Sequence, residues 1–334
     1  MKARNPGVDT LRLLAALEVI ILHVDFQGLS GLIPIAVRLQ ARWAVPFFFI
    51  ISGYYLAERL AHPARSDVRP TIYRMIWVFG LWSMIHIPIV LYQHDLKEVF
   101  RRLLFPSFIY VGTYFHLWFP SSIVLGLIFL LFCFYYKIER LLPVFSALIL
   151  LHIWMAGSYN IFGIKFPFDF ETARHWISVP LMYIGILLHR RGPFNKLLAF
   201  GLLIGGLLLQ ALEAYLLLTR YNISPYNHEI LIGTIPFALG AASLALGGIK
   251  FLEHPLTSAW GREYSLGIYL SHALIALVIG KLTGWIQLSP ALLPIRELIL
   301  PFLILLACIG ALAALRKWLP AVFKWLLGNH IQQE

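Results

Sequence analysis

The chain has 334 residues, of which 60% are hydrophobic and only 13% carry a charge. Soluble domains average about 25% charged residues, so this composition excludes an ordinary soluble protein and indicates an integral membrane protein. The net charge of +11 is explained by Lys and Arg in loops beside membrane helices, and no nucleic-acid-binding motif is present. Cys133 and Cys308 both lie in apolar segments, which predicts neither a disulfide nor a metal site.

The first apolar segment, residues 8–27, contains Arg12 and His23. Charged residues interrupt the run and no small-residue cleavage site follows it, so we expect a retained helix rather than a signal peptide. Eleven helical steps of about 100° bring both side chains to within roughly 20° of one face, about 16 Å apart along the axis. Ionisable groups at membrane depth usually line a cavity or a pathway. The alternative is that each side chain extends to the nearer headgroups.

Nine further apolar runs follow, and together with the first they predict an all-α integral membrane protein, a bundle of about ten transmembrane helices in a single domain over residues 1–334. Lys and Arg are more frequent in alternate loops on one side, which predicts that both termini are cytoplasmic. Arg12 then lies near the cytoplasmic face and His23 toward the far side. The nine runs are 43–59, 72–92, 117–136, 142–157, 176–189, 196–218, 228–248, 264–284 and 297–319.

An arginine cluster precedes and enters the third run, and its members are Arg59, Arg65, Arg69 and Arg74. Guanidinium groups suit phosphate oxygens, so a cytoplasmic cluster could bind an anionic cofactor. The alternative is ordinary positive-inside charge, which we prefer for Arg59 and Arg65. Arg74 is the stronger candidate, because it lies within the apolar onset of the span.

Three further segments contain candidate binding or structural residues. In the second run, Ser52 and Gly53 allow a neighbouring backbone or a ligand to approach closely, although small residues in a span more often serve packing. At the start of the fourth run, Trp118 follows His116 and could be an interfacial belt residue. In the ninth run, His272 lies inside an apolar helix, where it could simply hydrogen-bond a neighbouring helix.

Four strings in chain order carry a family resemblance. They are Asp9-Thr10-Leu11-Arg12 leading to His23, the Val45–Leu56 segment with its Ser-Gly-Tyr, His116-Leu117-Trp118-Phe119, and Ser265–His272. Together they resemble the membrane acyltransferase-3 family, which O-acylates cell-surface glycans such as O-antigen and peptidoglycan. The family's Arg-x10-His motif maps onto Arg12 and His23. Its second motif, two basic residues three apart at the start of the third span, maps onto Arg74 alone, because Thr71 stands at the first position; Arg69 could substitute from one turn earlier.

The resemblance implies a multi-pass O-acyltransferase of the bacterial inner membrane, with cytoplasmic acetyl-CoA or another acyl-CoA as co-substrate and no metal. The acceptor would be a hydroxyl of a cell-surface or lipid-linked glycan, of the lipopolysaccharide O-antigen type. Some members append an extracytoplasmic esterase-like domain. Because this chain ends at Glu334 without one, we expect its membrane domain to act alone or with a partner.

The spacing of Arg12 and His23 suggests how such a reaction could proceed. If Arg12, Arg74 and Arg69 hold the CoA phosphates near the inner face, the pantetheine arm, whose length is on the order of 16 Å, places the thioester near His23. His23 could then act as general base to the acceptor hydroxyl or carry the acyl group covalently, and we favour the general base.

A membrane transporter of a glycan precursor or small anion is the alternative function, with Arg12 and His23 in its translocation pathway. Transporters often contain internal repeats and helices broken at the midplane, and no convincing repeat is present in this sequence. The residues do not indicate which sugar is the acceptor or how many copies of the chain associate.

Overall fold

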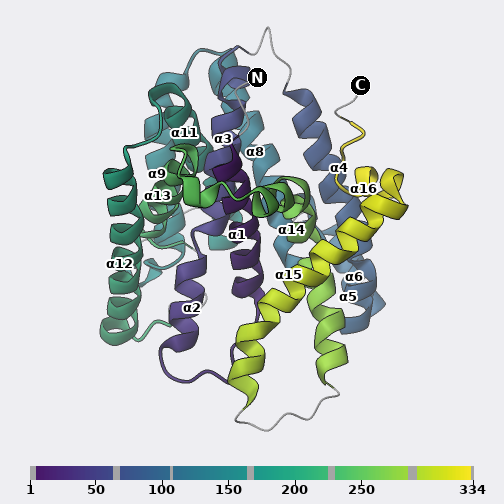
Figure 1. Cartoon of the computed structure of the whole chain (residues 1–334). Helices are drawn as coiled ribbons and strands as arrows, with labels where there is room; N and C mark the ends of the chain where they lie inside the picture. Colours follow the sequence, from purple (N-terminus) through teal and green to yellow (C-terminus); the bar gives the residue numbers. More distant parts are fainter. Residues whose placement is uncertain are drawn as a thin grey trace.

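The computed structural model describes residues 5–62, 68–105, 108–163, 169–224, 230–284 and 292–331, and throughout this part of the chain the only regular secondary structure is helical. The prediction of an all-α membrane protein is therefore confirmed. Helix α1 (Pro6–His23) runs through the middle of the bundle, and the first and last described residues lie at the same end of it (Figure 1). Which side of the membrane that end faces stays a prediction.

Fifteen further α-helices and several short 3-10 turns complete the described fold. The α-helices are α2 (Ile33–Ala41), α3 (Ala44–Ala61), α4 (Arg69–Ile85), α5 (Ile87–Gln93), α6 (Leu96–Leu104), α7 (Phe108–Val111), α8 (Trp118–Tyr135), α9 (Leu142–Ala156), α10 (Phe170–Ala173), α11 (Ser178–Arg191), α12 (Lys196–Tyr221), α13 (Thr234–Leu246), α14 (Pro255–Gly284), α15 (Leu293–Trp318) and α16 (Pro320–Leu326). The 3-10 turn that matters for the site is η1 (Phe115–Leu117), directly before α8.

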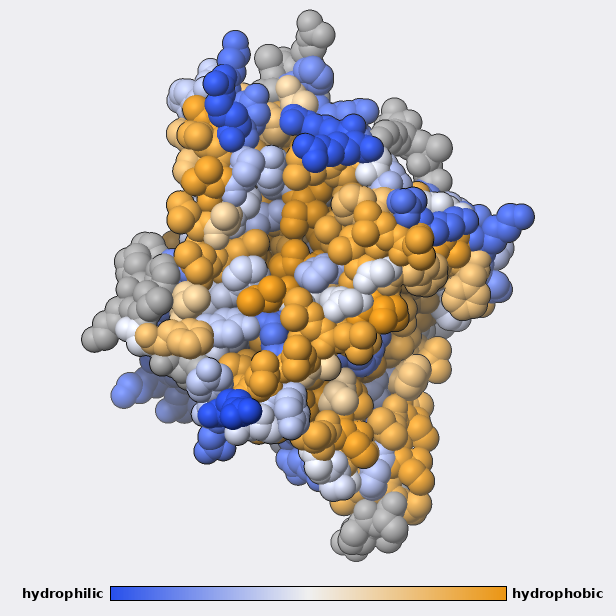
Figure 2. All heavy atoms as spheres, turned by 90° about the vertical axis from the view of Figure 1, so that its left-hand side faces the viewer, coloured by the Kyte–Doolittle hydropathy of each residue, from blue (hydrophilic) through white to orange (hydrophobic). Residues whose placement is uncertain are grey.

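Seven helical segments of the described chain are long and apolar enough to cross a membrane: Ile33–Ala61, Arg69–Gln93, Phe115–Tyr135, Glu139–Ala156, Lys196–Tyr221, Pro255–Leu282 and Leu293–Trp318. The other three predicted spans also contain helices, but each of these helices is too charged or too short to count as a membrane span by length and composition. Helix α1 has three charged residues, while α11 and α13 have only 14 and 13 residues. The number of spans supported by length and composition is thus seven rather than about ten. Seen from the side, hydrophobic residues cover much of the surface and hydrophilic ones gather toward both ends (Figure 2).

Helix α1 begins at a capping residue and ends where the backbone becomes extended. The side chain of Asn5 caps the helix by accepting from the Val8 amide at 3.1 Å, and Pro6 occupies the first turn, where its missing N–H has no cost. At the other end Val24 is extended, so the helix stops at His23 and not at residue 27 as predicted. His23 is consequently a helix-terminal residue.

Small residues allow backbones to approach closely around this core, as is common between membrane helices. On α3, a Cβ at Gly53 would collide with the backbone of Met182 on α11. Reciprocally, a Cβ at Gly185 on α11 would collide with the carbonyl oxygen of Ile50 on α3. A Cβ at Gly261 on α14 would likewise collide with the carbonyl oxygen of Asp9 on α1. These contacts fix α1 and α3 against their neighbours and hence position both helices that contribute to the site.

A buried carboxylate holds the segment that follows His23. Both oxygens of Glu297 on α15 accept from the backbone N–H of Gly28 at 2.9 Å, and Glu297 is only 3% exposed. A buried hydrogen bond to a charged group contributes about 1.5–3 kcal/mol. This bond therefore ties the connection between α1 and α2 to α15.

Replacing Glu297 by alanine should lower the free energy of unfolding by about 1.5–3 kcal/mol, because the Gly28 amide loses its partner. The measurement is the thermal midpoint of the detergent-solubilised protein. Glu253→Ala, at an exposed position, is the matched control and should leave the midpoint unchanged. A midpoint for Glu297→Ala equal to that of the wild type would show that the bond does not hold this segment.

Candidate active site

His23 is oriented by its own helix. Its Nδ1 lies 2.7 Å from the carbonyl oxygen of Val19, one turn earlier. A carbonyl can only accept, so Nδ1 carries the proton in the neutral ring and Nε2 is left with a lone pair. Asp25, which lies beyond the end of the helix, instead accepts from Gln27. The group that sets the tautomer of His23 is therefore a backbone carbonyl and not a carboxylate.

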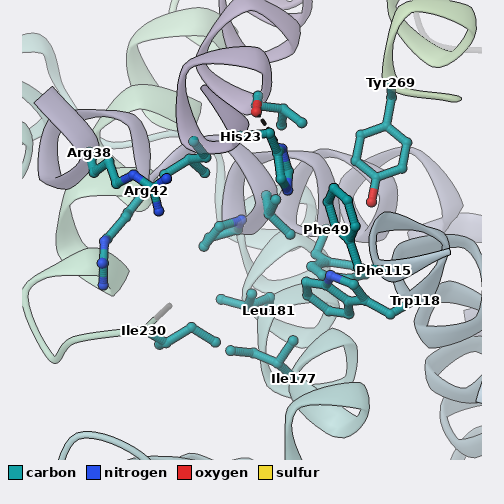
Figure 3. A pocket seen from close by; sticks show the side chains of 14 residues that line it. His23, Arg38, Arg42, Phe49, Phe115, Trp118, Ile177, Leu181, Ile230 and Tyr269 are labelled. Atoms are coloured by element: carbon teal, nitrogen blue, oxygen red, sulfur yellow. Dashed lines mark hydrogen bonds between the residues drawn. The ribbon is translucent and has the colours of Figure 1, made fainter. Parts of the chain in front are cut away.

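A first cavity of about 240 Å³ adjoins His23. Figure 3 shows its two unlike walls: Arg38 and Arg42 lie on one side, and the aromatic rings of Phe49, Phe115 and Trp118 lie on the other. Such a combination of apolar surface with a few placed polar groups is typical of a small-molecule site.

A second cavity of about 180 Å³ adjoins the same histidine. It lies between α1, η1, α14 and α15, and its polar lining residues besides His23 are Tyr114 and His272. His23 and Phe115 line both cavities and pack against each other, with ring centroids 4.9 Å apart. Both side chains keep exposed surface. The two cavities therefore adjoin the same pair of rings.

Behind His23 lies a row of three more histidines from three different elements. The ring centroid of His23 is 5.1 Å from that of His272 on α14, which is 4.9 Å from that of His116 on η1. His116 is in turn 4.9 Å from His86, at the break between α4 and α5. We call His23, His272, His116 and His86 the histidine row. Within the described residues, no group of three or more His, Cys, Asp or Glu side chains is arranged to hold a metal ion.

Hydrogen bonds fix η1 and its histidine against α14. The Nε2 of His116 lies 3.2 Å from the carbonyl oxygen of Leu270, and the hydroxyl of Tyr269 donates to the carbonyl oxygen of His116 itself. His272 bonds through Nδ1 to the carbonyl oxygen of Tyr269 at 2.6 Å. The two histidines named from the sequence, His116 and His272, are thus brought together with His23.

Trp118 lines a cavity beside His23, whereas Ser52 and Gly53 of the second predicted span do not. Trp118 lines the first cavity, and the guanidinium of Arg174 lies over its ring at 5.2 Å from the centroid. Ser52 donates to the carbonyl oxygen of Phe48 on its own helix at 2.8 Å. Gly53 packs on α11, and neither Ser52 nor Gly53 lines the two cavities beside His23.

The arginine candidates lie apart from His23. Arg12 donates to Asp9 at 3.1 Å, and its guanidinium lies over the ring of Tyr55, 5.5 Å from the centroid. Arg74 donates through Nε to the carbonyl oxygen of Leu327 at 2.9 Å, which ties α4 to the C-terminal segment. Neither lines the two cavities beside His23. Arg69 is the first residue of α4, and Arg65 lies outside the described residues.

The sequence analysis did not single out Arg38 and Arg42, which lie between the first two predicted runs. Arg38 is on helix α2 and Arg42 directly follows it, and both side chains line the first cavity, Arg42 with only 4% of its surface exposed. Their spacing of four residues, which places both on one helix face, was the available signal. His86 and Phe115 were also missed, because a lone histidine or phenylalanine in an apolar run has no distinguishing pattern.

Comparison with known proteins gives one match that covers nearly the whole chain. Residues 5–316 match the Acyl_transf_3 family, described as an acyltransferase domain. Two partial matches are an amino-acid racemase of Enterococcus faecalis, 33% identical over 132 residues, and a serine/alanine racemase of Enterococcus gallinarum, 30% identical over 131 residues. Each match covers 37% of this chain and 19% of the racemase, so the chain spans about a fifth of the length of these relatives. No solved structure matches.

Proposed function

Because the chain belongs to the membrane acyltransferase-3 family, and is therefore a multi-pass membrane acyltransferase, we propose that it moves an acyl group from acyl-CoA to a hydroxyl of a cell-surface or lipid-linked glycan. Acetyl-CoA is the simplest donor. The observation that carries this proposal is that His23 lines two cavities. We infer that each cavity receives one of the two substrates and that they meet at this histidine.

The first cavity suits the saccharide acceptor. In its aromatic wall, Phe115 and Trp118 keep exposed surface and offer flat faces to the apolar sides of sugar rings. On the opposite side, Arg38 and Arg42 supply hydrogen-bond donors for hydroxyl or acidic groups. The second cavity, which is smaller and mostly apolar, then receives the acyl end of the donor.

His23 acts as general base in this proposal. As the acceptor oxygen attacks the thioester carbonyl carbon, its proton passes to Nε2, the ring nitrogen left with a lone pair by the bond from Nδ1 to Val19. The carbon–sulfur bond then breaks, and the proton ends on the sulfur of CoA. In the variant route His23 itself takes the acyl group and passes it to the acceptor.

The CoA phosphates belong at the end of the bundle where α1 begins. Arg12 lies eleven residues before His23 on one continuous helix, a rise of about 16 Å, which is on the order of the length of a pantetheine arm. Arg74 and Arg69, at the start of α4, are the further candidates for phosphate contacts. On α1 itself, Arg12 as a phosphate ligand and His23 as the reacting residue would thus be separated along the helix axis.

Membranes that contain the chain should transfer radiolabel from acetyl-CoA to their endogenous glycan, and membranes from a deletion strain should not. The product should gain the mass of one acetyl group per modified hydroxyl, measured by mass spectrometry of the isolated polysaccharide. A transporter with Arg12 and His23 in its pathway would give labelled uptake without labelled glycan. That result would contradict the proposed function and favour transport.

A further inference from the structure

Three side chains of α4 hold the end of helix α16, which lies beside α4 near the C-terminal end of the described chain (Figure 1). The last carbonyls of a helix have no partner within the helix, and a helix of 7 residues is not stable by itself, so these donors fix its position. We call the three donors the α4 clamp. The bonded pairs, each 2.9 Å apart, are Nε of Arg74 with the carbonyl oxygen of Leu327, Nε1 of Trp77 with that of Trp325, and Nε1 of Trp82 with that of Leu326.

Packing around the α4 clamp is close. The ring of Trp77 meets that of Trp325 edge to face, with centroids 4.7 Å apart. Gly328 follows with a φ of +64°, in the left-handed region that glycine adopts without strain. A Cβ at Gly328 would lie only 2.9 Å from Cγ of Arg74. The end of α16 therefore fixes the side chain of Arg74 both by a hydrogen bond and by contact.

The guanidinium of Arg74 uses one side and keeps another. Among the described residues, Nε is its one nitrogen with a hydrogen-bond partner. The side chain is partly exposed, and its terminal nitrogens are not enclosed. Because a guanidinium is planar and rigid, the bond from Nε restricts its plane and leaves the edge formed by Nη1 and Nη2 available. That edge matches two oxygens of one phosphate group.

An arginine that is oriented before its ligand arrives loses less side-chain entropy on binding, which raises affinity. We propose that the end of α16 positions Arg74 for a phosphate group of acyl-CoA. The inference rests on the proposed function. Trp77 and Trp82 are then positioning residues, because they act through α16 on Arg74. Affinity for the donor thus depends on a C-terminal helix that lines neither cavity beside His23.

The α4 clamp allows substitutions that leave Arg74 itself in place. Trp82→Phe and Trp77→Phe keep an aromatic ring and remove the N–H that holds α16. Gly328→Ala keeps both N–H groups but places a Cβ against Arg74, in a strained backbone conformation. Arg74→Gln removes the phosphate-binding edge. Trp318→Phe, at a 71% exposed position that ends α15, is the matched control.

The experiment measures transfer of label from radioactive acetyl-CoA to endogenous glycan in membranes with equal amounts of each full-length variant. We expect Arg74→Gln to raise KM for acetyl-CoA by roughly 10- to 100-fold, the loss of hydrogen bonds to a charged group. Trp82→Phe, Trp77→Phe and Gly328→Ala should each raise KM by roughly 2- to 10-fold. In all four variants kcat should change less than about twofold, and Trp318→Phe should leave KM and kcat unchanged.

A donor without phosphates separates positioning from general damage. Acetyl-pantetheine carries the same thioester and lacks the phosphate groups, so its rate of transfer should be the same in the four variants and the wild type. If the variants lower transfer from both donors in equal proportion, α16 serves the structure of the whole bundle and the inference is overturned.

The remaining outcomes distinguish this inference from the proposed function. If Arg74→Gln raises KM while Trp82→Phe, Trp77→Phe and Gly328→Ala leave it unchanged, α16 does not position Arg74. If Arg74→Gln also leaves KM unchanged, Arg74 binds no phosphate; the inference falls and the role of His23 stands. If wild-type membranes transfer no label to glycan, the proposed function itself fails. If one α16 variant does not accumulate in membranes, the other two carry the test; if none accumulates, the α4 clamp serves folding and the inference is overturned.

Discussion

Substitution of His23 by asparagine should reduce acyl transfer by about 100- to 10,000-fold, the usual contribution of a positioned general base. Asparagine keeps a donor near the position of Nδ1, so the bond to the carbonyl oxygen of Val19 and the end of α1 should survive. What is lost is the nitrogen that accepts the proton. The measurement is the rate of label transfer from acetyl-CoA to glycan at equal membrane content of the variant and the wild type.

His152→Asn should retain the wild-type rate in the same assay. That result would show that loss of a histidine from an apolar helix does not by itself lower the rate of acyl transfer. Label that accumulates on wild-type protein when acceptor is withheld, and is absent from His23→Asn, would identify the covalent route. Undiminished transfer by His23→Asn, with no change in KM, would exclude His23 from both routes.

Replacing Gly185 by leucine should prevent normal assembly of the bundle. Any Cβ at this position collides with the carbonyl oxygen of Ile50, and the opposing contact between Gly53 and Met182 leaves α3 and α11 no room to shift. Overpacking usually costs 1–3 kcal/mol, and we expect about 3 kcal/mol or more here because the clash is with backbone on both helices. The measurements are the yield of monodisperse protein in detergent and its thermal midpoint.

Gly201→Leu is the matched control, because a Cβ at this position of α12 meets nothing within 4 Å. It should change neither yield nor midpoint. Equal yields and midpoints for the two variants would show that the close approach of α3 and α11 is not required for folding.

The sequence predicted the membrane class and the helices well, because apolar runs and their charged flanks are local features. Each of the ten predicted runs contains a helix in the structure. The errors lie where a local pattern is ambiguous. The run 8–27 still contains apolar Val24 and Phe26 after His23, yet the helix ends at His23 because the chain turns extended at Val24. Likewise, Arg38 and Arg42 lie outside the predicted runs, and only the fold shows that helix α2 and its C-terminal end bring them to a cavity.

The site could be predicted only in part. The eleven-residue spacing of Arg12 and His23 on one helix is a property of the sequence, and the named His116 and His272 do lie in a row with His23. The contact of His23 with His272 and His116 could not be derived from spacing, because it depends on how α1, η1 and α14 pack. His272, for example, lies 249 residues after His23. His86 joins the row because α4 ends beside it, two residues before Pro88, a proline that marks the break in the sequence but does not say what the histidine will contact.

The place of His23 and Phe115 beside two cavities has a consequence for the order in which the substrates bind. If each substrate occupies its own cavity, neither one blocks the entry of the other, and both can be present at His23 together. Initial-rate plots for the two substrates would then intersect, as in a sequential mechanism of random order. A shared cavity would instead require the first product to leave before the second substrate enters, and its plots would be parallel.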